Sequence, residues 1–264
     1  MTRLPRLFLV SGVLLIGVWL TLPTLAILPV SFNSKRSLVV SFSDWSGQWY
    51  QQFFDDPRWV DALTNSLTVA VCASLLATTL GTLAAFGLLR LSPTPQRLLG
   101  GLLAAPIITP VILLGVGIYL VYLRWGVAGT FGGLVVAHAV TAIPLVSQPV
   151  LATLQRLDPN LDRAAASLGA RAPARFVQVV LPVISPGVLA GALFAFIWSF
   201  DEVVMAVFLT SPERQTLPVL MFTSVTQSVD PTVAAAAILV LLASTVLVLS
   251  ALALLRKGAD RDQN

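Results

Sequence analysis

Residues 63–89 read LTNSLTVAVCASLLATTLGTLAAFGLL, without a single charged side chain. An α-helix rises about 1.5 Å per residue, so about 20 apolar residues are enough to cross the hydrocarbon core of a membrane. Stretches of similar length and character recur along the chain, at 8–30, 98–123, 131–154, 187–209 and 232–255. We therefore predict an all-α polytopic membrane protein, with six transmembrane helices in a single transmembrane domain over residues 1–264.

The composition supports this class of protein. Of the 264 residues, 56% are hydrophobic and 11% are charged, whereas soluble domains carry about 25% charged residues. A lone cysteine, Cys72, excludes a disulfide framework and a cysteine-based metal site. The net charge is +4, but the basic residues are scattered singly. We therefore expect membrane lipid around the chain, with no nucleic-acid partner and no metal site.

The basic residues predict the orientation in the membrane. If the N-terminus is cytoplasmic, eleven of the 16 Lys and Arg residues fall in segments on the inside, as the positive-inside rule requires. The first apolar stretch follows Arg3 and Arg6, as in a signal peptide, but it is longer than the usual signal core of about 7–15 residues. We expect it to remain as an anchor, with both termini cytoplasmic.

Several helix starts are marked by a capping residue followed by proline. Ser and Asp side chains accept hydrogen bonds from free helical amides, and proline at the first helical position loses no hydrogen bond. These pairs predict helix starts before the second span, within the loop 155–182, and before the fifth and sixth spans. They are Asp56–Pro57, Asp158–Pro159, Ser185–Pro186 and Asp230–Pro231.

The loop 155–182 is the longest predicted cytoplasmic segment. After Asp158, four apolar residues recur at helical spacing on one face, and Gly169 supplies a stop. A second short helix is expected from Pro173 to Pro182. The apolar face could fold back onto the spans or dock into a groove of another protein. The four residues are Leu161, Ala164, Ala165 and Leu168.

Aromatic residues gather between the first two spans, in residues 31–61. Trp and Tyr are typical of the membrane–water interface. We expect this segment to lie at headgroup level and to fix the depth of the chain; direct contact with a soluble partner is the alternative. The residues are Trp45, Trp49, Tyr50, Phe53, Phe54 and Trp59.

The loop also resembles a known family. The motif DRAAASLGA at 162–170, followed by Leu181–Pro182, is similar to the cytoplasmic loop of permease subunits of binding-protein-dependent ABC importers, where Glu-Ala-Ala and Gly precede Leu-Pro. Ala164, Ala165 and Gly169 match that pattern. Arg163 stands where the family has glutamate, although Asp162 places an acid one residue earlier. Residues 196–242 resemble the spermidine/putrescine branch, through Ser199, Phe200, Asp201, Leu217, Pro218 and Pro231.

This resemblance implies a type I ABC importer permease fold in a bacterial inner membrane. It implies a dimer of ATPase subunits, a second homologous permease subunit that forms a heterodimer with this chain, and a periplasmic or lipid-anchored solute-binding protein. The chain has no Gly-x-x-x-x-Gly-Lys-Ser/Thr phosphate loop, so we expect no enzyme activity or cofactor in it, and ATP and Mg²⁺ on the partner. The expected ATPase-coupling residues are Leu161, Asp162, Arg163, Ala164, Ala165, Leu168 and Gly169.

Two adjacent acids, Asp201 and Glu202, interrupt the fifth apolar stretch. Ionisable groups are costly at membrane depth, and the face of Trp198 would favour an ammonium group. These three residues are therefore candidates for the path of a cationic solute. The alternative is that the acids anchor a helix end or pair with the partner permease.

The solute that the resemblance favours is a polyamine, spermidine or putrescine. The same machinery carries other solutes in related branches, such as opines, phosphonates, amino-acid-like amines or ferric ions. A secondary transporter would show internal repeats and more charges at mid-membrane. An intramembrane enzyme would need a converging catalytic set, and His138 is the only histidine. We expect His138 to be a hydrogen-bonded interior residue.

Overall fold

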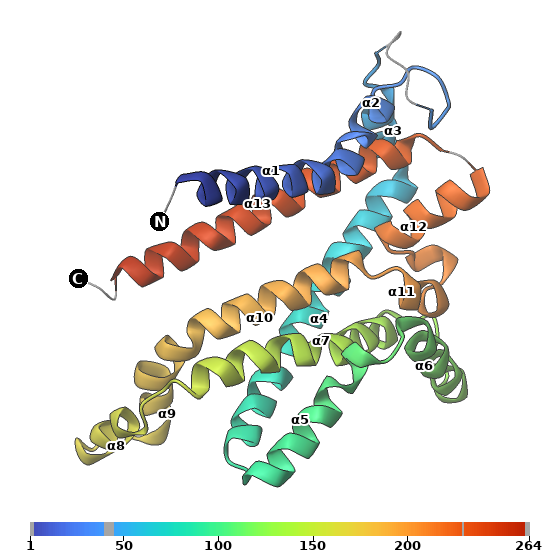
Figure 1. Ribbon diagram of the computed structural model, residues 1–264. Helices are drawn as coiled ribbons and strands as arrows, with labels where there is room; N and C mark the ends of the chain where they lie inside the picture. Colours follow the sequence, from blue (N-terminus) through green and yellow to red (C-terminus); the bar gives the residue numbers. More distant parts are fainter. Residues whose placement is uncertain (1–2, 40–44, 229, 262–264) are drawn as a thin grey trace. The chain divides into compact units, whose positions relative to one another are not determined.

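The computed structural model describes residues 3–39, 45–228 and 230–261, and these are mostly helical (Figure 1). Five helices of the described chain are long and apolar enough to cross a membrane, and a bent pair, Pro93–Ile108 with Val111–Trp125, makes a sixth candidate. This confirms the predicted all-α polytopic fold. The five helices are Leu9–Ser31, Pro57–Leu89, Phe131–Leu154, Ala172–Asp201 and Thr232–Ser250.

The chain divides into two compact units. The terminal unit comprises Met1–Val60 and Leu220–Ser250, and the central unit comprises Asp61–Val219 and Ala251–Asn264. The single domain expected over residues 1–264 stays a prediction.

The terminal unit contains short and long helices around an aromatic cluster. Asp56 begins α4 as predicted: its carboxylate accepts the Arg58 amide and pairs with the Arg58 guanidinium at 2.7 Å. The side-chain hydrogen bond from Arg58 holds the pKa of Asp56 below its usual range. The helices are α1 (Arg3–Leu25), α2 (Ile27–Ser31), α3 (Gln48–Asp55), the start of α4 (Pro57–Leu89), the end of α12 (Leu217–Thr223), a π-helical turn (Ser224–Ser228) and most of α13 (Thr232–Arg261).

The aromatic residues of this unit differ in how deeply they are buried. Trp49 and Phe53 are spaced four apart on α3, so they share one helix face, and both are buried. Trp59 is also buried, with its ring 5.8 Å from that of Phe53. These three residues therefore pack into the unit, whereas Trp45 and Phe54 are exposed. The position of the segment at headgroup level stays a prediction.

The central unit is built around α7 and α10, which pack against each other (Figure 1). α7 is the most buried of the apolar helices, with 61% of its apolar window inside the protein. Its bounds, Phe131–Leu154, are those that hydropathy predicts. The remaining elements of the unit are most of α4, α5 (Pro93–Ile108), α6 (Val111–Trp125), α8 (Pro159–Ser167), α9 (Ala172–Arg175), a π-helical turn (Phe176–Val180), α10 (Leu181–Asp201), α11 (Val204–Leu209) and a 3₁₀ turn (Pro212–Arg214).

A stripe of small residues lets α10 approach α7 closely. Gly187, Gly191, Ala195 and Ser199 follow each other at four-residue spacing, and all four are buried. A Cβ atom on Gly191 would lie 2.9 Å from the Cα atom of Val146 on α7. Helices in membranes associate through such small residues, which allow close backbone contact. The spacing of this stripe is visible in the sequence, but hydropathy alone does not reveal it.

The third predicted span, 98–123, is wrong as a single straight helix. The chain forms α5 and α6, which meet at an angle of 98°. Pro110 has no amide hydrogen to continue α5, and a residue before proline is driven out of the helical region. Thr109 accordingly has an extended backbone, with φ −75° and ψ 132°.

The fifth predicted span, 187–209, has different limits in the structure. α10 starts at Leu181 and ends at Asp201, and the chain is continuously helical from Ala172 onward. Pro182 does not end the second loop helix, because the π-helical turn before it changes the hydrogen-bond register. Ser185–Pro186 does not start a helix either. In a regular helix the carbonyl of Pro182 would accept the amide of residue 186, but proline has no amide hydrogen. The Ser185 hydroxyl donates to this carbonyl instead, at 2.8 Å.

Candidate functional site

The first candidate site is α8, whose two ends are fixed by the residues that predicted it. The Asp158 carboxylate accepts the amide of Asn160 at 2.9 Å, which caps the start of the helix. At the other end, the Ala170 amide donates to the Ala165 carbonyl and the Gly169 amide to the Ala166 carbonyl. Gly169 has φ +84°, a left-handed conformation in which only glycine is unstrained. This C-terminal motif turns the chain sharply into α9.

The apolar face of α8 is open. The side chain of Leu168 is 89% exposed and that of Leu161 is 50% exposed, while Ala164 is exposed and Ala165 is partly buried. Arg163 is also exposed, and the side chain of Asp162 lies outside the described residues. In Figure 1, α8 and α9 lie at the end of the α7–α10 pair. The helix therefore presents an apolar surface without being covered by the rest of the central unit.

The second candidate site lies at the opposite end of α10. Trp198, Asp201 and Glu202 line one open cavity of about 380 Å³. The structure thus brings the three predicted path residues together. The wall around them is apolar, formed by Val111, Leu145, Phe194, Ile197, Val203 and Val204.

The two acids at this cavity have different surroundings. Asp201 is the last residue of α10 and is exposed, with no ion pair among the described residues. Glu202 is only 8% exposed, and its carboxylate accepts the amides of Met205 at 2.7 Å and Ala206 at 2.8 Å. Glu202 therefore caps the first turn of α11, as the helix-end alternative predicts. Asp201 is the acid that stays exposed at the cavity.

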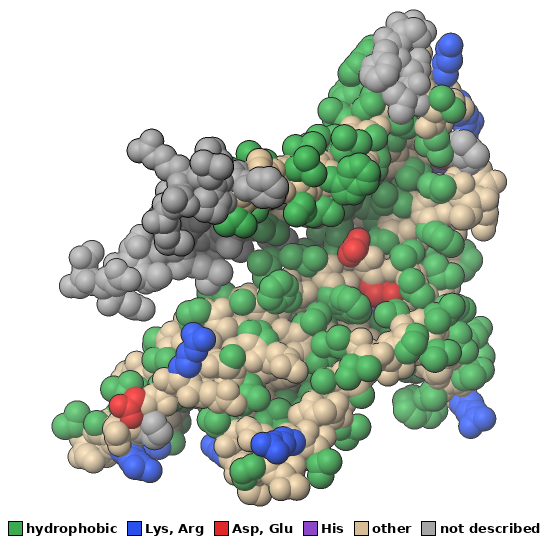
Figure 2. All heavy atoms as spheres, viewed as in Figure 1, with side chains coloured by type: hydrophobic (Ala, Val, Ile, Leu, Met, Phe, Trp, Pro, Cys, Tyr) green, Lys and Arg blue, Asp and Glu red, His purple; other side chains and the backbone are tan. Residues whose placement is uncertain are grey.

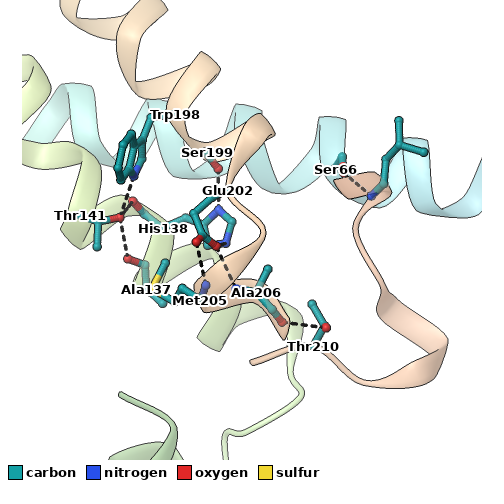
Figure 3. A network of polar contacts seen from close by, with 11 residues as sticks. Ser66, Ala137, His138, Thr141, Trp198, Ser199, Glu202, Met205, Ala206 and Thr210 are labelled. Carbon is teal, nitrogen blue, oxygen red and sulfur yellow. Dashed lines mark hydrogen bonds and ion pairs between the residues drawn. The ribbon is translucent and has the colours of Figure 1, made fainter. Parts of the chain in front are cut away.

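Behind the cavity, a buried polar network joins α7 to α10 (Figure 3). The Trp198 indole donates to the Thr141 hydroxyl at 3.2 Å. The Nδ1 atom of His138 lies 2.9 Å from the Ser199 hydroxyl, and the His138 ring is fully buried. The prediction of a hydrogen-bonded interior histidine is confirmed. Sequence reasoning missed the role of Ser199 as its partner.

The two candidate sites lie at the two ends of the helical segment Ala172–Asp201. This segment contains 30 residues, which at 1.5 Å per residue extend over about 45 Å, more than the thickness of a hydrocarbon core. The segment is therefore long enough for Asp201 and α8 to lie on opposite sides of a membrane. Figure 2 shows hydrophobic side chains spread over the described surface, with only a few Asp and Glu side chains visible on this face.

Residues 77–259 match the family described as "Binding-protein-dependent transport system inner membrane component", and the chain belongs to this family. It is a permease subunit of an ABC importer. The matched range contains α8 and the cavity at the end of α10.

Two relatives and one solved structure extend this result. The putrescine transport system permease protein PotI of Escherichia coli (strain K12) is 33% identical over 241 residues, which cover 87% of this chain and 84% of PotI. The spermidine/putrescine transport system permease protein PotC of Haemophilus influenzae is 29% identical over 240 residues, which cover 91% of this chain and 93% of PotC. A crystal structure of a bacterial ABC transporter involved in import of the polysaccharide alginate matches this chain with a TM-score of 0.74 and 14% identity, over 97% of both chains. At that identity the likeness shows the fold alone.

Proposed function

We propose that this chain forms part of the path by which an ATP-driven importer moves polyamines, or related small cationic amines, across the inner membrane. The observation that carries the proposal is the exposed carboxylate of Asp201 beside Trp198 at one open cavity. A carboxylate attracts ammonium groups, and an indole face favours them further. The similarity to putrescine and spermidine permeases supports the same substrate class.

The partners follow from the division of labour in such an importer. An ATPase dimer would bind the exposed face of α8 and supply the ATP and Mg²⁺ chemistry, so that this chain needs no cofactor. A second homologous permease subunit would complete the path as a heterodimer, and a periplasmic or lipid-anchored binding protein would deliver the solute. The family description, which names transport dependent on a binding protein, supports the last of these partners.

The proposed orientation places both termini and α8 in the cytoplasm. The excess of Lys and Arg in the corresponding segments supports it. Asp201 then lies toward the periplasmic side, because the helical segment from Ala172 to Asp201 crosses the membrane. A cationic solute leaving its binding protein would meet this acid early.

Replacing Asp201 with asparagine should raise the apparent KM for putrescine about tenfold, the effect of losing about 1.4 kcal/mol of charge attraction. The change preserves shape and removes only the charge. Uptake of labelled putrescine at several concentrations measures the effect. The matched control is Glu213→Gln, an exposed acid that does not line the cavity. An unchanged KM in Asp201→Asn would eliminate the role of Asp201 in the cation path.

Reversing the charge of Arg163 tests the geometry of α8. If the proposed ATPase contact follows the family pattern, Arg163→Glu should keep the uptake rate within about twofold of wild type or raise it, since exposed charges contribute little to stability. Uptake per ATP hydrolysed is the measurement. Arg156→Glu, exposed in the same loop but outside α8, is the control. A severe loss of uptake confined to Arg163→Glu would show that the contact between this permease and its ATPase differs from the family pattern.

The substrate class can be tested in cells that lack other polyamine uptake systems. Expression of the complete transporter should restore accumulation of labelled putrescine, with competition by spermidine. Competition instead by an opine, a phosphonate, an amino-acid-like amine or ferric ion would assign the same machinery to that solute. Accumulation that persists when the ATPase partner is inactivated would favour a secondary transporter.

A further inference from the structure

The carboxylate of Glu202 is buried at the corner where α10 ends and α11 begins. Its Oε1 and Oε2 atoms accept the Met205 and Ala206 amides, at 2.7 and 2.8 Å. These amides have no partner within α11, so the carboxylate satisfies both of them and α11 in turn satisfies the carboxylate. The present position of Glu202 therefore depends on α11 staying where it is.

A second donor lies near the same carboxylate. The Nε2 atom of His138 is fully buried, has no hydrogen-bond partner among the described residues, and lies 3.7 Å from Oε2 of Glu202. That distance is too long for a hydrogen bond. An ionised carboxylate can only accept, so Nε2 must carry the hydrogen to interact favourably with it; Nδ1 then accepts the Ser199 hydroxyl. In that tautomer the Nε2–H group faces Glu202 without a hydrogen bond; Figure 3 shows the His138 ring beside Glu202.

The imidazole of His138 is a third possible donor beside a carboxylate whose two oxygens already accept the α11 amides. If α11 moved away, Glu202 would be left buried without its two donors, which is costly for a charged group. A short movement of the side chain would instead bring Oε2 into hydrogen-bond distance of Nε2. His138 is on α7, which leads into α8, and Glu202 follows α10, which leads out of the same loop. α8 is thus connected along the chain to both sides of this contact.

We propose that Glu202 is a two-position latch, which caps α11 in the conformation described here and pairs with His138 when α11 is released. His138 is then a positioning residue for transport, and it acts through Glu202 and not on the solute. The latch would open and close the corner that carries Asp201 at the cavity. This inference rests on the proposed coupling of the chain to an ATPase, and not on the identity of the solute.

Two substitutions of His138 separate the latch from a purely structural role. Glutamine places an amide donor near the position of Nε2, whereas asparagine places its amide near the position of Nδ1 and has nothing at Nε2. If the latch operates, His138→Gln should keep function and His138→Asn should lose it. If the only role of His138 is its contact with Ser199, His138→Asn should keep function and His138→Gln should lose it. Ser199→Ala removes the Nδ1 contact alone and should be milder than His138→Asn.

The movement of α11 can be followed by labelling a thiol at an exposed position of that helix. Val207 is 42% exposed, so Val207→Cys in a Cys72→Ser background gives this chain a single cysteine, on α11, and labelling is read on this subunit. The purified complete transporter, in lipid nanodiscs, is treated with a maleimide with and without ATP and vanadate. Elution as an intact complex and basal ATP hydrolysis verify that each variant is folded and assembled.

We expect ATP and vanadate to change the labelling rate in the reporter background and in His138→Gln. In His138→Asn the released state should be at least about tenfold less populated, so the change is lost. An equal change in His138→Asn, or a loss in His138→Gln with a normal response in His138→Asn, would overturn the latch. No change in the reporter background would instead contradict the ATPase coupling on which the latch rests.

Discussion

Replacing Leu168 with glutamate is expected to abolish transport by preventing the ATPase from binding to α8. The Leu168 side chain is 89% exposed on the free subunit, and burying a leucine in a partner's groove contributes about 1.5–3 kcal/mol. A glutamate there would add the cost of removing a charge from water. Together these effects should weaken the contact at least about 100-fold. Co-purification of the ATPase with the tagged permease, and ATP hydrolysis by the assembly, measure the result.

The control for this experiment is Gln155→Glu, which adds the same charge to an exposed position of the same loop, outside α8. This control should retain the ATPase. If Leu168→Glu also retains it with normal transport, the apolar face of α8 serves the other role considered from the sequence, in which it folds back onto the spans.

Replacing Gly191 with alanine should destabilise the permease strongly although it adds only one carbon atom. The new Cβ would lie 2.9 Å from the Cα atom of Val146, and a backbone atom inside a packed helix pair cannot move aside cheaply. Overpacking of this kind costs about 1–3 kcal/mol. The fraction of protein that stays monodisperse after heating, followed by fluorescence-detected gel filtration, should fall at a lower temperature than for wild type.

A matched substitution separates packing from the intrinsic effect of alanine. Gly117, in α6, has no atom within 4 Å of the position a Cβ would take. Gly117→Ala should be neutral or stabilising, because alanine favours a helix over glycine by about 0.5–1 kcal/mol. Equal behaviour of the two variants would contradict the close contact between α7 and α10.

Hydropathy predicted which residues are apolar enough to span a membrane, but not the path they follow. α7 has the predicted bounds because apolar residues and helix coincide there. At Thr109 and at Glu202 the apolar pattern continues while the helix stops. The sequence does carry a local signal at the first of these, because proline at position 110 removes an amide and restricts the residue before it.

The break at Glu202 was harder to predict because its cause is a side chain that bonds forward along the chain. Two adjacent acids in an apolar stretch indicated an unusual site, but not that one acid would cap α11 and the other remain exposed. By contrast, α8 was predictable from Asp158 and Gly169, since capping and a left-handed turn act within a few residues. The partner of His138 required tertiary structure, because Ser199 is 61 residues away.

The most direct test of this account is putrescine accumulation by the purified transporter in proteoliposomes, with ATP on the side of α8 and the binding protein on the other. The account predicts accumulation only when ATP hydrolysis and the binding protein are both present, and none in the Leu168→Glu variant. Accumulation driven by an ion gradient without ATP, or unaffected by removal of the binding protein, would contradict it.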